Sequence, residues 1–300
     1  MIKIFSFFSY LAAILFAATV PAGAAHADIS VRDDDGNLVV LKKPAQRIIA
    51  MAPHVTELLY AAGGGDRIVG AVTYSDYPEA AKLLPRVGDN RQVDLERVIA
   101  MKPDLIVVWM HGSSERQVDI LRQLKVPIFH SEPKKLDGIA DSLVRMGQLM
   151  GTESVANAAA ADMRAQFAAL AQKYGKRAPV RMFYQVWDKP LYTLSNGSIV
   201  SDAMRLCGGV NIFGELAVTA PVVGIEAVLQ ADPEAIFGTA EKDYGGVNLW
   251  RQYPGMQAVK RDNLFTLNGE LLNRAGPRMV PGTLALCEKL DLARQRRGVK

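Results

Sequence analysis

The 300-residue sequence lacks the short motifs that mark common enzyme classes. It contains no G-x-S-x-G, H-E-x-x-H, G-x-x-x-x-G-K-S/T or C-x-x-C motif. The glycine run 63–65 follows a predicted helix rather than a strand, so it indicates a helix end and not a phosphate-binding loop. These absences favour a binding protein over an enzyme.

A strong net charge and a second long apolar run are also missing. The formal net charge is +4 at pH 7, and no stripe of Lys and Arg alternates with aromatic residues. No nucleic-acid partner is therefore predicted. After residue 27, no apolar run reaches the roughly 18 residues that a membrane span needs.

The one long apolar run lies at the N-terminus. Lys3 precedes an apolar stretch over residues 4–20, and small residues lead to Ala25-His26-Ala27, an A-x-A cleavage pattern. We expect residues 1–27 to be an export signal that is cut after Ala27, so the mature chain would be exported. An uncleaved anchor is the alternative.

Cysteine is scarce, with only Cys207 and Cys287 present. In an oxidising compartment such a pair favours a disulfide. Closing a loop of about 80 residues would stabilise the fold by about 4 kcal/mol on the chain-entropy model. Two buried free thiols are the alternative.

Strand and helix patterns alternate along the chain, which predicts an α/β fold with mainly parallel sheets. A short hairpin is expected within residues 30–43. Strands are predicted at 47–52, 68–73, 104–109, 126–130, 180–186, 235–238 and 264–267, and helices at 55–62, 93–101, 115–124, 199–206, 225–230 and 277–294.

The longest helical pattern runs from Glu153 to Tyr174 and contains neither Gly nor Pro. Its length and its many alanines predict a helix of roughly 33 Å. The apolar positions that define its expected face are Val155, Ala159, Met163, Phe167 and Leu170. We interpret this helix as a strut between an N-terminal lobe at 28–152 and a C-terminal lobe at 176–300, with the linking segment at 153–175. An ordinary surface helix of one larger domain is the alternative.

One internal repeat supports two lobes. Residues 93–107 and 223–237 each read as a short amphipathic helix, a proline and a buried strand, and they lie 130 positions apart. Each copy carries a glutamate at the same place, Glu96 and Glu226. Chance similarity of two helix–proline–strand units is the alternative.

Three histidines outside the export signal follow or end predicted strands: His54, His111 and His130. With a carboxylate they would suit Zn²⁺ or Mn²⁺. No short ligand spacing supports such a site, so three unrelated loop histidines are the favoured interpretation and no metal site is predicted.

Aromatic residues at predicted strand ends carry the strongest binding signal. They are Tyr74, Tyr77, Trp109 and Tyr192, and two arginines, Arg274 and Arg278, bracket the segment before the last helix. Flat aromatic walls with an arginine suit a large planar ligand that carries amides or carboxylates. Burial of each aromatic in the core is the alternative.

Six stretches then resemble one family. They are P-x-x-T-E-L at 53–58, Y-S-D-Y-P at 74–78, D-L-E-R-x-x-A-M-K-P-D at 94–104, E-R-Q-V at 115–118, C-G-G-x-N-I-F at 207–213 and R-A-G-P-R at 274–278. Together they resemble the periplasmic substrate-binding proteins of the vitamin B12 and ferric-siderophore class of ABC importers, with the cobalamin-binding members the most similar. The resemblance covers nearly the whole mature chain.

The resemblance implies a non-enzymatic transport protein without a cofactor, in which two Rossmann-like lobes joined by one long rigid helix hold a ligand between them. The expected ligand is a corrinoid such as vitamin B12, and haem or a ferric siderophore is the alternative. A metal-dependent exported enzyme or a Zn/Mn carrier is less favoured. The expected partner is an inner-membrane permease with its ATPase subunits, which a free monomer would approach.

The resemblance also implies roles for individual residues. The expected ligand contacts are His54, Tyr74, Asn90, Trp109, Tyr192, Glu270, Leu271, Leu272, Asn273 and Arg274. Glu96 and Glu226 would dock onto arginines of the permease, and Cys207 and Cys287 stand where the family has its disulfide. The chain departs from the family in the pocket, because Asn90 and Ala220 replace tryptophans and the loop 270–273 lacks aromatic residues. His54 is the residue that would ligate an iron or cobalt centre.

Overall fold

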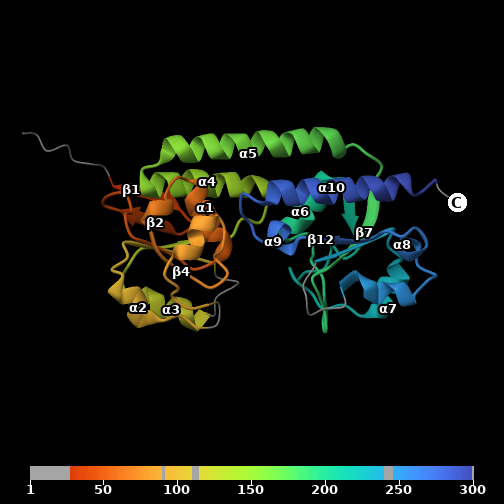
Figure 1. Ribbon diagram of the computed structural model, residues 1–300, viewed down its shortest axis with the longest axis horizontal. Helices are drawn as coiled ribbons and strands as arrows, with labels where there is room; N and C mark the ends of the chain where they lie inside the picture. Colours follow the sequence, from red (N-terminus) through yellow and green to blue (C-terminus); the bar gives the residue numbers. More distant parts are fainter. Residues whose placement is uncertain (1–27, 90–91, 110–114, 240–245, 299–300) are drawn as a thin grey trace, which may run out of the picture.

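A computed structural model describes residues 28–89, 92–109, 115–239 and 246–298. Two α/β lobes lie side by side beneath a layer of long helices (Figure 1). Each lobe is built on a four-stranded parallel sheet. The predicted fold class is therefore confirmed, while residues 1–27 and the predicted cleavage site lie outside the described residues.

The N-terminal lobe holds the sheet β4-β3-β5-β6, with strands Ile68–Ala71, Ile48–Ala50, Leu105–Val108 and Ile128–His130. All strand pairs in this sheet are parallel. Every residue of β3 and β5 is buried, as expected for strands covered on both faces. The helices of this lobe are α1 (Pro53–Ala61), α2 (Leu95–Ala100) and α3 (Glu115–Gln123), and the predicted hairpin is β1 (Ile29–Arg32) with β2 (Leu38–Leu41).

The C-terminal lobe holds the sheet β10-β7-β11-β12, with strands Gly209–Asn211, Val180–Gln185, Ala235–Thr239 and Leu264–Leu267. Its helices are α6 (Ile199–Leu206), α7 (Ile225–Ala231), α8 (Gln257–Lys260) and α9 (Gly269–Leu272). A small hairpin joins β8 (Trp187–Asp188) to β9 (Leu191–Tyr192). The strands and α-helices that the sequence did not predict here, β8, β9, β10, α8 and α9, contain at most four residues each and so lack a readable period.

The two sheets have the same strand order. In each, the first strand in the chain stands second, the second strand stands at its edge, and the third and fourth follow on the other side. The third strand of each sheet is preceded by the short helix that carries the repeated glutamate. Because α2 and α7 begin 130 residues apart, as do β5 and β11, the internal repeat is a structural repeat.

The repeat extends to the residues that fix the third strand of each sheet. In the N-terminal lobe the Asp104 carboxylate accepts from the Arg47 backbone N–H at 2.9 Å, and the Arg47 side chain donates to the Met101 carbonyl at 2.8 Å. In the C-terminal lobe the Glu234 carboxylate accepts from the Arg181 backbone N–H at 3.2 Å, and the Arg181 side chain donates to the carbonyl of residue 231 at 2.7 Å. The same clamp therefore joins helix, loop and strand in both lobes.

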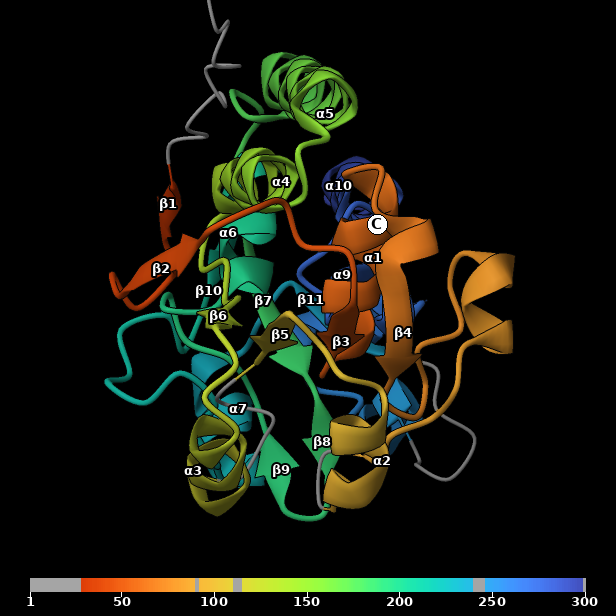
Figure 2. The same cartoon turned by 90° about the vertical axis from the view of Figure 1, so that its left-hand side faces the viewer.

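Three long helices form the layer above the sheets: α4 (Leu136–Met150), α5 (Glu153–Tyr174) and α10 (Met279–Gln295). Helix α5 has the predicted bounds and spans both lobes, with α4 below it over one lobe and α10 over the other (Figures 1 and 2). None of the helices in the described residues is long and apolar enough to cross a membrane.

Helix α4 was not predicted from the sequence. It contains Gly138, Ser142 and Gly147, which are poor helix formers in isolation. It packs closely on α5, because a Cβ added at Gly147 would lie 2.3 Å from the Cβ of Ala156. Tertiary packing therefore stabilises a helix that its intrinsic propensity does not favour.

The predicted apolar face of α5 was partly wrong. Val155 is 52 % exposed, and the buried side chains are Ala156, Ala160, Met163, Phe167 and Tyr174. The buried face is shifted by one position at its start, because α5 packs its small alanines closely against α4. The apolar core beneath the long helices runs without a break from the N-terminal lobe through α5 into the C-terminal lobe.

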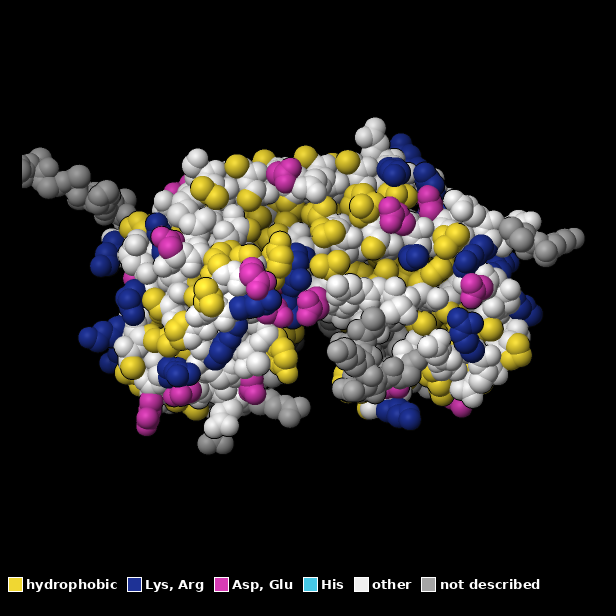
Figure 3. Space-filling model, in the orientation of Figure 1, with side chains coloured by type: hydrophobic (Ala, Val, Ile, Leu, Met, Phe, Trp, Pro, Cys, Tyr) yellow, Lys and Arg dark blue, Asp and Glu magenta, His cyan; other side chains and the backbone are white. Residues whose placement is uncertain are grey.

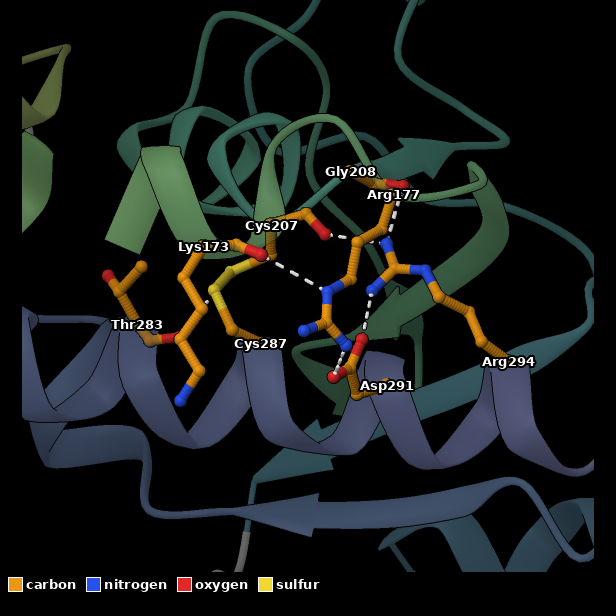
Figure 4. The surroundings of a disulfide bond; sticks show 8 residues. All are labelled: Lys173, Arg177, Cys207, Gly208, Thr283, Cys287, Asp291 and Arg294. Carbon is orange, nitrogen blue, oxygen red and sulfur yellow. Dashed lines mark hydrogen bonds and ion pairs between the residues drawn. A yellow bond between two sulfur atoms is a disulfide. The ribbon is translucent and has the colours of Figure 1, made fainter. Parts of the chain in front are cut away.

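The predicted disulfide is confirmed and belongs to the C-terminal lobe (Figure 4). It joins Cys207, at the end of α6, to Cys287 in α10, and both residues are fully buried. Next to it, the Arg294 side chain donates to the Cys207 carbonyl at 2.7 Å and pairs with Asp291 at 2.8 Å. Arg177 pairs with the same carboxylate, so α10 is held to this lobe by covalent and ionic contacts.

Candidate ligand-binding cleft

A cleft separates the two lobes on the side away from α5. Figure 3 shows the surface hollowed between them, below the long helices. The segments that follow β3, β4 and β12 meet across the junction of the lobes, through contacts of Glu57 and Asp76 with Arg274. Ends of parallel strands are the usual place for ligand sites in α/β proteins.

Tyr74 is the most exposed aromatic residue near the junction. It follows β4, its side chain is 71 % exposed, and its backbone has a φ of 67°, in the left-handed region that non-glycine residues rarely adopt. The next residue is anchored, since the Ser75 backbone N–H donates to the Val72 carbonyl and the Thr56 hydroxyl donates to the Ser75 hydroxyl at 3.0 Å. The fold therefore holds this strained conformation with the ring projecting from the surface.

Trp109 and His54 form a second aromatic unit of the N-terminal lobe. Their rings are perpendicular, with centroids 5.6 Å apart. His54 is buried, and its Nε2 lies 3.3 Å from the Ser131 carbonyl oxygen, which can only accept, so Nε2 carries the proton. Burial lowers the pKa of His54 to about 4, so the ring is neutral at neutral pH.

The predicted contact residues of the C-terminal lobe occupy different environments. Tyr192 is partly exposed and pairs with Val222 through a backbone bridge. In the loop before Arg274, Glu270 and Asn273 are exposed, Leu271 is half-buried and Leu272 is fully buried in the core. Leu272 therefore supports this loop from the core and does not reach its surface. The direct ligand contacts expected of the other residues stay predictions. Asn90 lies outside the described residues.

Charged side chains from both lobes meet beside these residues. The Glu57 carboxylate, 2 % exposed, accepts two hydrogen bonds from Arg278, at 2.7 and 3.0 Å. Arg274 lies 3.1 Å from Asp76, 3.4 Å from Glu270 and 3.6 Å from Glu57. Three carboxylates thus share two guanidinium groups at the junction, and the Arg278 guanidinium also lies 4.4 Å from the centre of the Tyr77 ring.

Sequence reasoning missed Glu57 and Asp76. Each pairs with an arginine about 200 positions further along the chain, a distance at which no local pattern is visible. One signal was available, because Glu57 is a charged residue directly before the apolar pair 58–59 in a mainly apolar helical pattern, and residues 54–59 of this helix are buried. A buried carboxylate in such a place requires a cationic partner.

The repeated glutamates lie on the outer surface of each lobe. Glu96 and Glu226 occupy the first turn of α2 and of α7, and both are exposed. Figure 1 places both helices on the side of the molecule opposite α5. Two equivalent anionic positions are therefore presented by the two lobes on one side.

The histidines do not form a metal centre with their neighbours in the described part of the chain. Within these residues, no group of three or more His, Cys, Asp and Glu side chains could hold a metal ion. His130 instead lies beside Asp35 and Glu132. It ends β6, at one edge of the sheet, whereas Tyr74 follows β4, at the opposite edge. His111 lies outside the described residues.

Known proteins of one kind match this chain. Residues 48–271 match the model of the family described as periplasmic binding protein. A vitamin B12-binding protein from Vibrio cholerae serotype O1 is 40 % identical over 253 residues, which cover 84 % of this chain and 91 % of that protein. A vitamin B12-binding protein from Yersinia pestis is 35 % identical over 255 residues, covering 84 % and 89 % of the two chains.

Solved structures agree with these relatives. The crystal structure of the periplasmic vitamin B12 binding protein BtuF of Vibrio cholerae matches with a TM-score of 0.78 and 38 % identity, covering 84 % of this chain and 99 % of that one. A periplasmic haem-binding protein from Pseudomonas aeruginosa matches with a TM-score of 0.70 and 25 % identity, covering 81 % and 91 % of the two chains.

Proposed function

Since the chain belongs to the periplasmic binding protein family, we propose that it captures a corrinoid such as vitamin B12 between its lobes and delivers it to an ABC importer. The observation that carries this proposal is the 40 % identity to a vitamin B12-binding protein over most of both chains. The fold supports it, because two matching lobes enclose a cleft that aromatic and polar side chains border.

The side chains at the cleft suit a large planar ligand with a polar rim. Tyr74 and Trp109 from one lobe and Tyr192 from the other offer ring faces for the apolar surfaces of a macrocycle. Glu270, Asn273 and Arg274 offer donors and acceptors for peripheral amide groups. The N-terminal wall is then mainly aromatic, and the wall from the C-terminal lobe combines one tyrosine with the aliphatic residues Ala220 and Val222.

The charges at the junction favour an amide-bearing ligand over a dicarboxylate. Arg274 and Arg278 are already surrounded by Glu57, Asp76 and Glu270, so these five groups together carry a net negative charge. This negative charge would repel the two propionates of a haem, whereas it would not repel the neutral amides of a corrinoid.

Delivery would use the side of the molecule opposite α5, on which the cleft also opens. Glu96 and Glu226 would contact arginines on the two symmetric halves of an inner-membrane permease that works with ATPase subunits. The protein would act as a periplasmic monomer after removal of residues 1–27, with lobes at 28–152 and 176–300 around the linking segment 153–175.

Calorimetric titration of the purified mature protein with cyanocobalamin tests the proposal. We expect one site per chain with a dissociation constant of micromolar or tighter. The matched variant Tyr74→Ala should weaken binding at least tenfold, whereas Leu83→Ala, which removes an exposed apolar side chain outside the cleft, should not. Absence of heat at high protein concentration would reject corrinoid capture.

Haem is the second candidate ligand, and His54 is the observation that favours it. A neutral imidazole beside Trp109 at the junction would serve as a ligand for the haem iron. Titration with haemin should then shift the Soret band, and His54→Ala should abolish that shift. An unshifted haem spectrum together with a positive cyanocobalamin titration would reject haem and support the corrinoid as the ligand.

A further inference from the structure

The junction between the lobes contains two arginines that are bound in different ways. Arg278 stands directly before α10, and Arg274 lies four residues earlier in the non-helical segment that leads to this helix. Both reach carboxylates of the N-terminal lobe, so both bridge the lobes. The two arginine side chains are almost equally buried, but the geometry of their contacts and the burial of their main partners differ enough to assign them separate tasks.

Arg278 makes a fixed contact. It binds Glu57 through two parallel hydrogen bonds, and the side chains of the pair are 14 % and 1 % exposed. The hydrogen bonding that Arg278 donates to Glu57 is the main reason that the pKa of Arg278 is raised, so this arginine stays charged. A bidentate arginine–carboxylate pair has a defined geometry. Removing Arg278 would leave the buried Glu57 carboxylate with the longer contact to Arg274 at 3.6 Å, and removing Glu57 would leave Arg278 with the longer contact to Glu270 at 3.5 Å. Either change would therefore weaken the compensation of a buried charge.

Close packing surrounds this pair. A Cβ added at Gly276 would lie 3.3 Å from the Glu57 carboxylate, so the segment between the two arginines runs directly against α1. The Arg278 guanidinium is covered by the Tyr77 ring on the same lobe as Glu57. The start of α10 is therefore held between α1 and the loop after β4.

Arg274 makes exchangeable contacts. Its three carboxylate neighbours lie at 3.1 to 3.6 Å, and none of them forms a bidentate pair with it. Asp76 and Glu270 are 40 % and 50 % exposed, so water or a ligand can reach them. A new partner at Arg274 would displace the Asp76 contact without exposing a buried charge.

Asp76 is also connected to the exposed ring of Tyr74. The two residues are separated only by Ser75, whose hydroxyl is bonded to Thr56, the neighbour of Glu57. The loop after β4 is thus attached to α1 at Ser75 and to the other lobe at Asp76. A change of partner at Arg274 would therefore release Asp76, the residue next to the anchored Ser75.

From this arrangement we propose that Glu57 and Arg278 form a permanent pin between the lobes, and that Asp76 is a positioning residue that holds Arg274 until a ligand replaces it. The second part rests on the proposed ligand cleft, whereas the first does not. Because the pin and α5 both fix the lobes, ligand binding is expected to leave the distance between the lobes almost unchanged.

The pin is tested on ligand-free protein by electron-spin distance measurement. Unnatural amino acids that carry spin labels would replace Leu83 in the N-terminal lobe and Val210 in the C-terminal lobe, and both positions are exposed. We expect one narrow distance distribution for the unmodified pair and for Arg274→Gln, and a broadened one for Glu57→Gln. Arg278→Lys, which keeps the charge but loses the bidentate geometry, should broaden it less.

Thermal melts of each variant show whether it is folded. A folded Glu57→Gln or Arg278→Lys protein with an unchanged narrow distribution would overturn the pin. Broadening by Arg274→Gln as large as that by Glu57→Gln would also overturn the assignment of separate tasks.

The role of Asp76 is tested by the sign of its effect on cyanocobalamin affinity. If Asp76 competes with the ligand for Arg274, Asp76→Asn should raise affinity about threefold while Arg274→Gln lowers it about tenfold. Glu79→Gln is the matched control, because Glu79 is an exposed carboxylate of the same segment that pairs only with Lys82 in the described residues, and it should change nothing.

A loss of affinity in Asp76→Asn would overturn the competition. Absence of cyanocobalamin binding by the unmodified protein would reject the proposed function, and the distance measurement would still decide whether the pin exists. The two failures are therefore distinguishable.

Discussion

The two lobes share a scaffold but are stabilised by different means. Both have the same strand order, the same carboxylate–arginine clamp on the third strand and a glutamate in the same exposed turn. The C-terminal lobe adds a disulfide and a cluster of arginines around α10. The N-terminal lobe instead contributes a neutral buried histidine and the strained, exposed Tyr74.

This comparison separates two kinds of position. Features that recur in both lobes serve the backbone or the outer face, where a symmetric partner would bind. Features that occur in only one lobe border the cleft or fix one lobe to its long helix. The two lobes therefore share a framework, while the surfaces that border the cleft differ between them.

The largest expected difference between the lobes concerns the disulfide. Reduction, or the double variant Cys207→Ser with Cys287→Ser, should destabilise the C-terminal lobe by about 4 kcal/mol because a loop of about 80 residues is released. Hydrogen exchange should accelerate in α6 and α10 more than in the sheet of the N-terminal lobe. Equal acceleration in both lobes would show that they unfold as one unit.

Protonation of a buried histidine at acid pH should destabilise the N-terminal lobe. All four histidines precede residue 131, so none lies in the C-terminal lobe. The pKa of His54 is about 4 in the folded protein and 6.5 when unfolded, so its stabilisation is complete above pH 6.5 and is lost as the pH falls towards 4. The loss is about 3 kcal/mol. Denaturant unfolding at a series of pH values measures this effect. In His54→Gln the free energy of unfolding should not show this fall between pH 6.5 and 4, and an unchanged fall would refute the assignment to His54.

The repeated glutamates should behave alike. Glu96→Arg and Glu226→Arg should each weaken docking to the permease at least tenfold, about 1.4 kcal/mol or more, because each places a cation opposite a cation. Surface-bound permease in nanodiscs would report this loss, with Glu79→Arg as the control. Cyanocobalamin affinity should stay unchanged, and its collapse would show that these residues are not on an outer docking surface.

The smallest effect concerns two equivalent backbone positions. Lys102 and Asp232 both have a positive φ, 45° and 41°. Lys102→Gly should stabilise the protein by up to about 1 kcal/mol, because glycine adopts this conformation without strain. Asp232→Gly should destabilise by about 1 kcal/mol, because the Asp232 carboxylate accepts hydrogen bonds from the backbone and side chain of Gln257. Denaturant melts would resolve the opposite signs, and equal signs would contradict this distinction.

Local and repeated patterns were readable from the sequence. Helix α5 was predicted with its observed bounds because its composition and length are sufficient to define it. The repeat around Glu96 and Glu226 was visible because proline and apolar residues recur at a fixed offset. The disulfide followed from the presence of only two cysteines in a chain that the sequence predicts to be exported.

Features that depend on distant parts of the chain were not readable. Helix α4 contains two glycines and is stabilised by its packing on α5 through Gly147. Glu57 and Asp76 gain their meaning only from arginines that the fold brings across the lobe junction. Leu272 was grouped with ligand contacts because its neighbours belong to that loop, although its own side chain is in the core.

The central claim is that one ligand is held by both lobes at once. Hydrogen exchange of the mature protein with and without cyanocobalamin tests it most directly. Binding between the lobes should slow exchange in the loop 74–78 and in the segment 269–274, and should leave α2 and α7 unchanged. Protection confined to one lobe, or protection of α2 and α7 instead, would contradict the account.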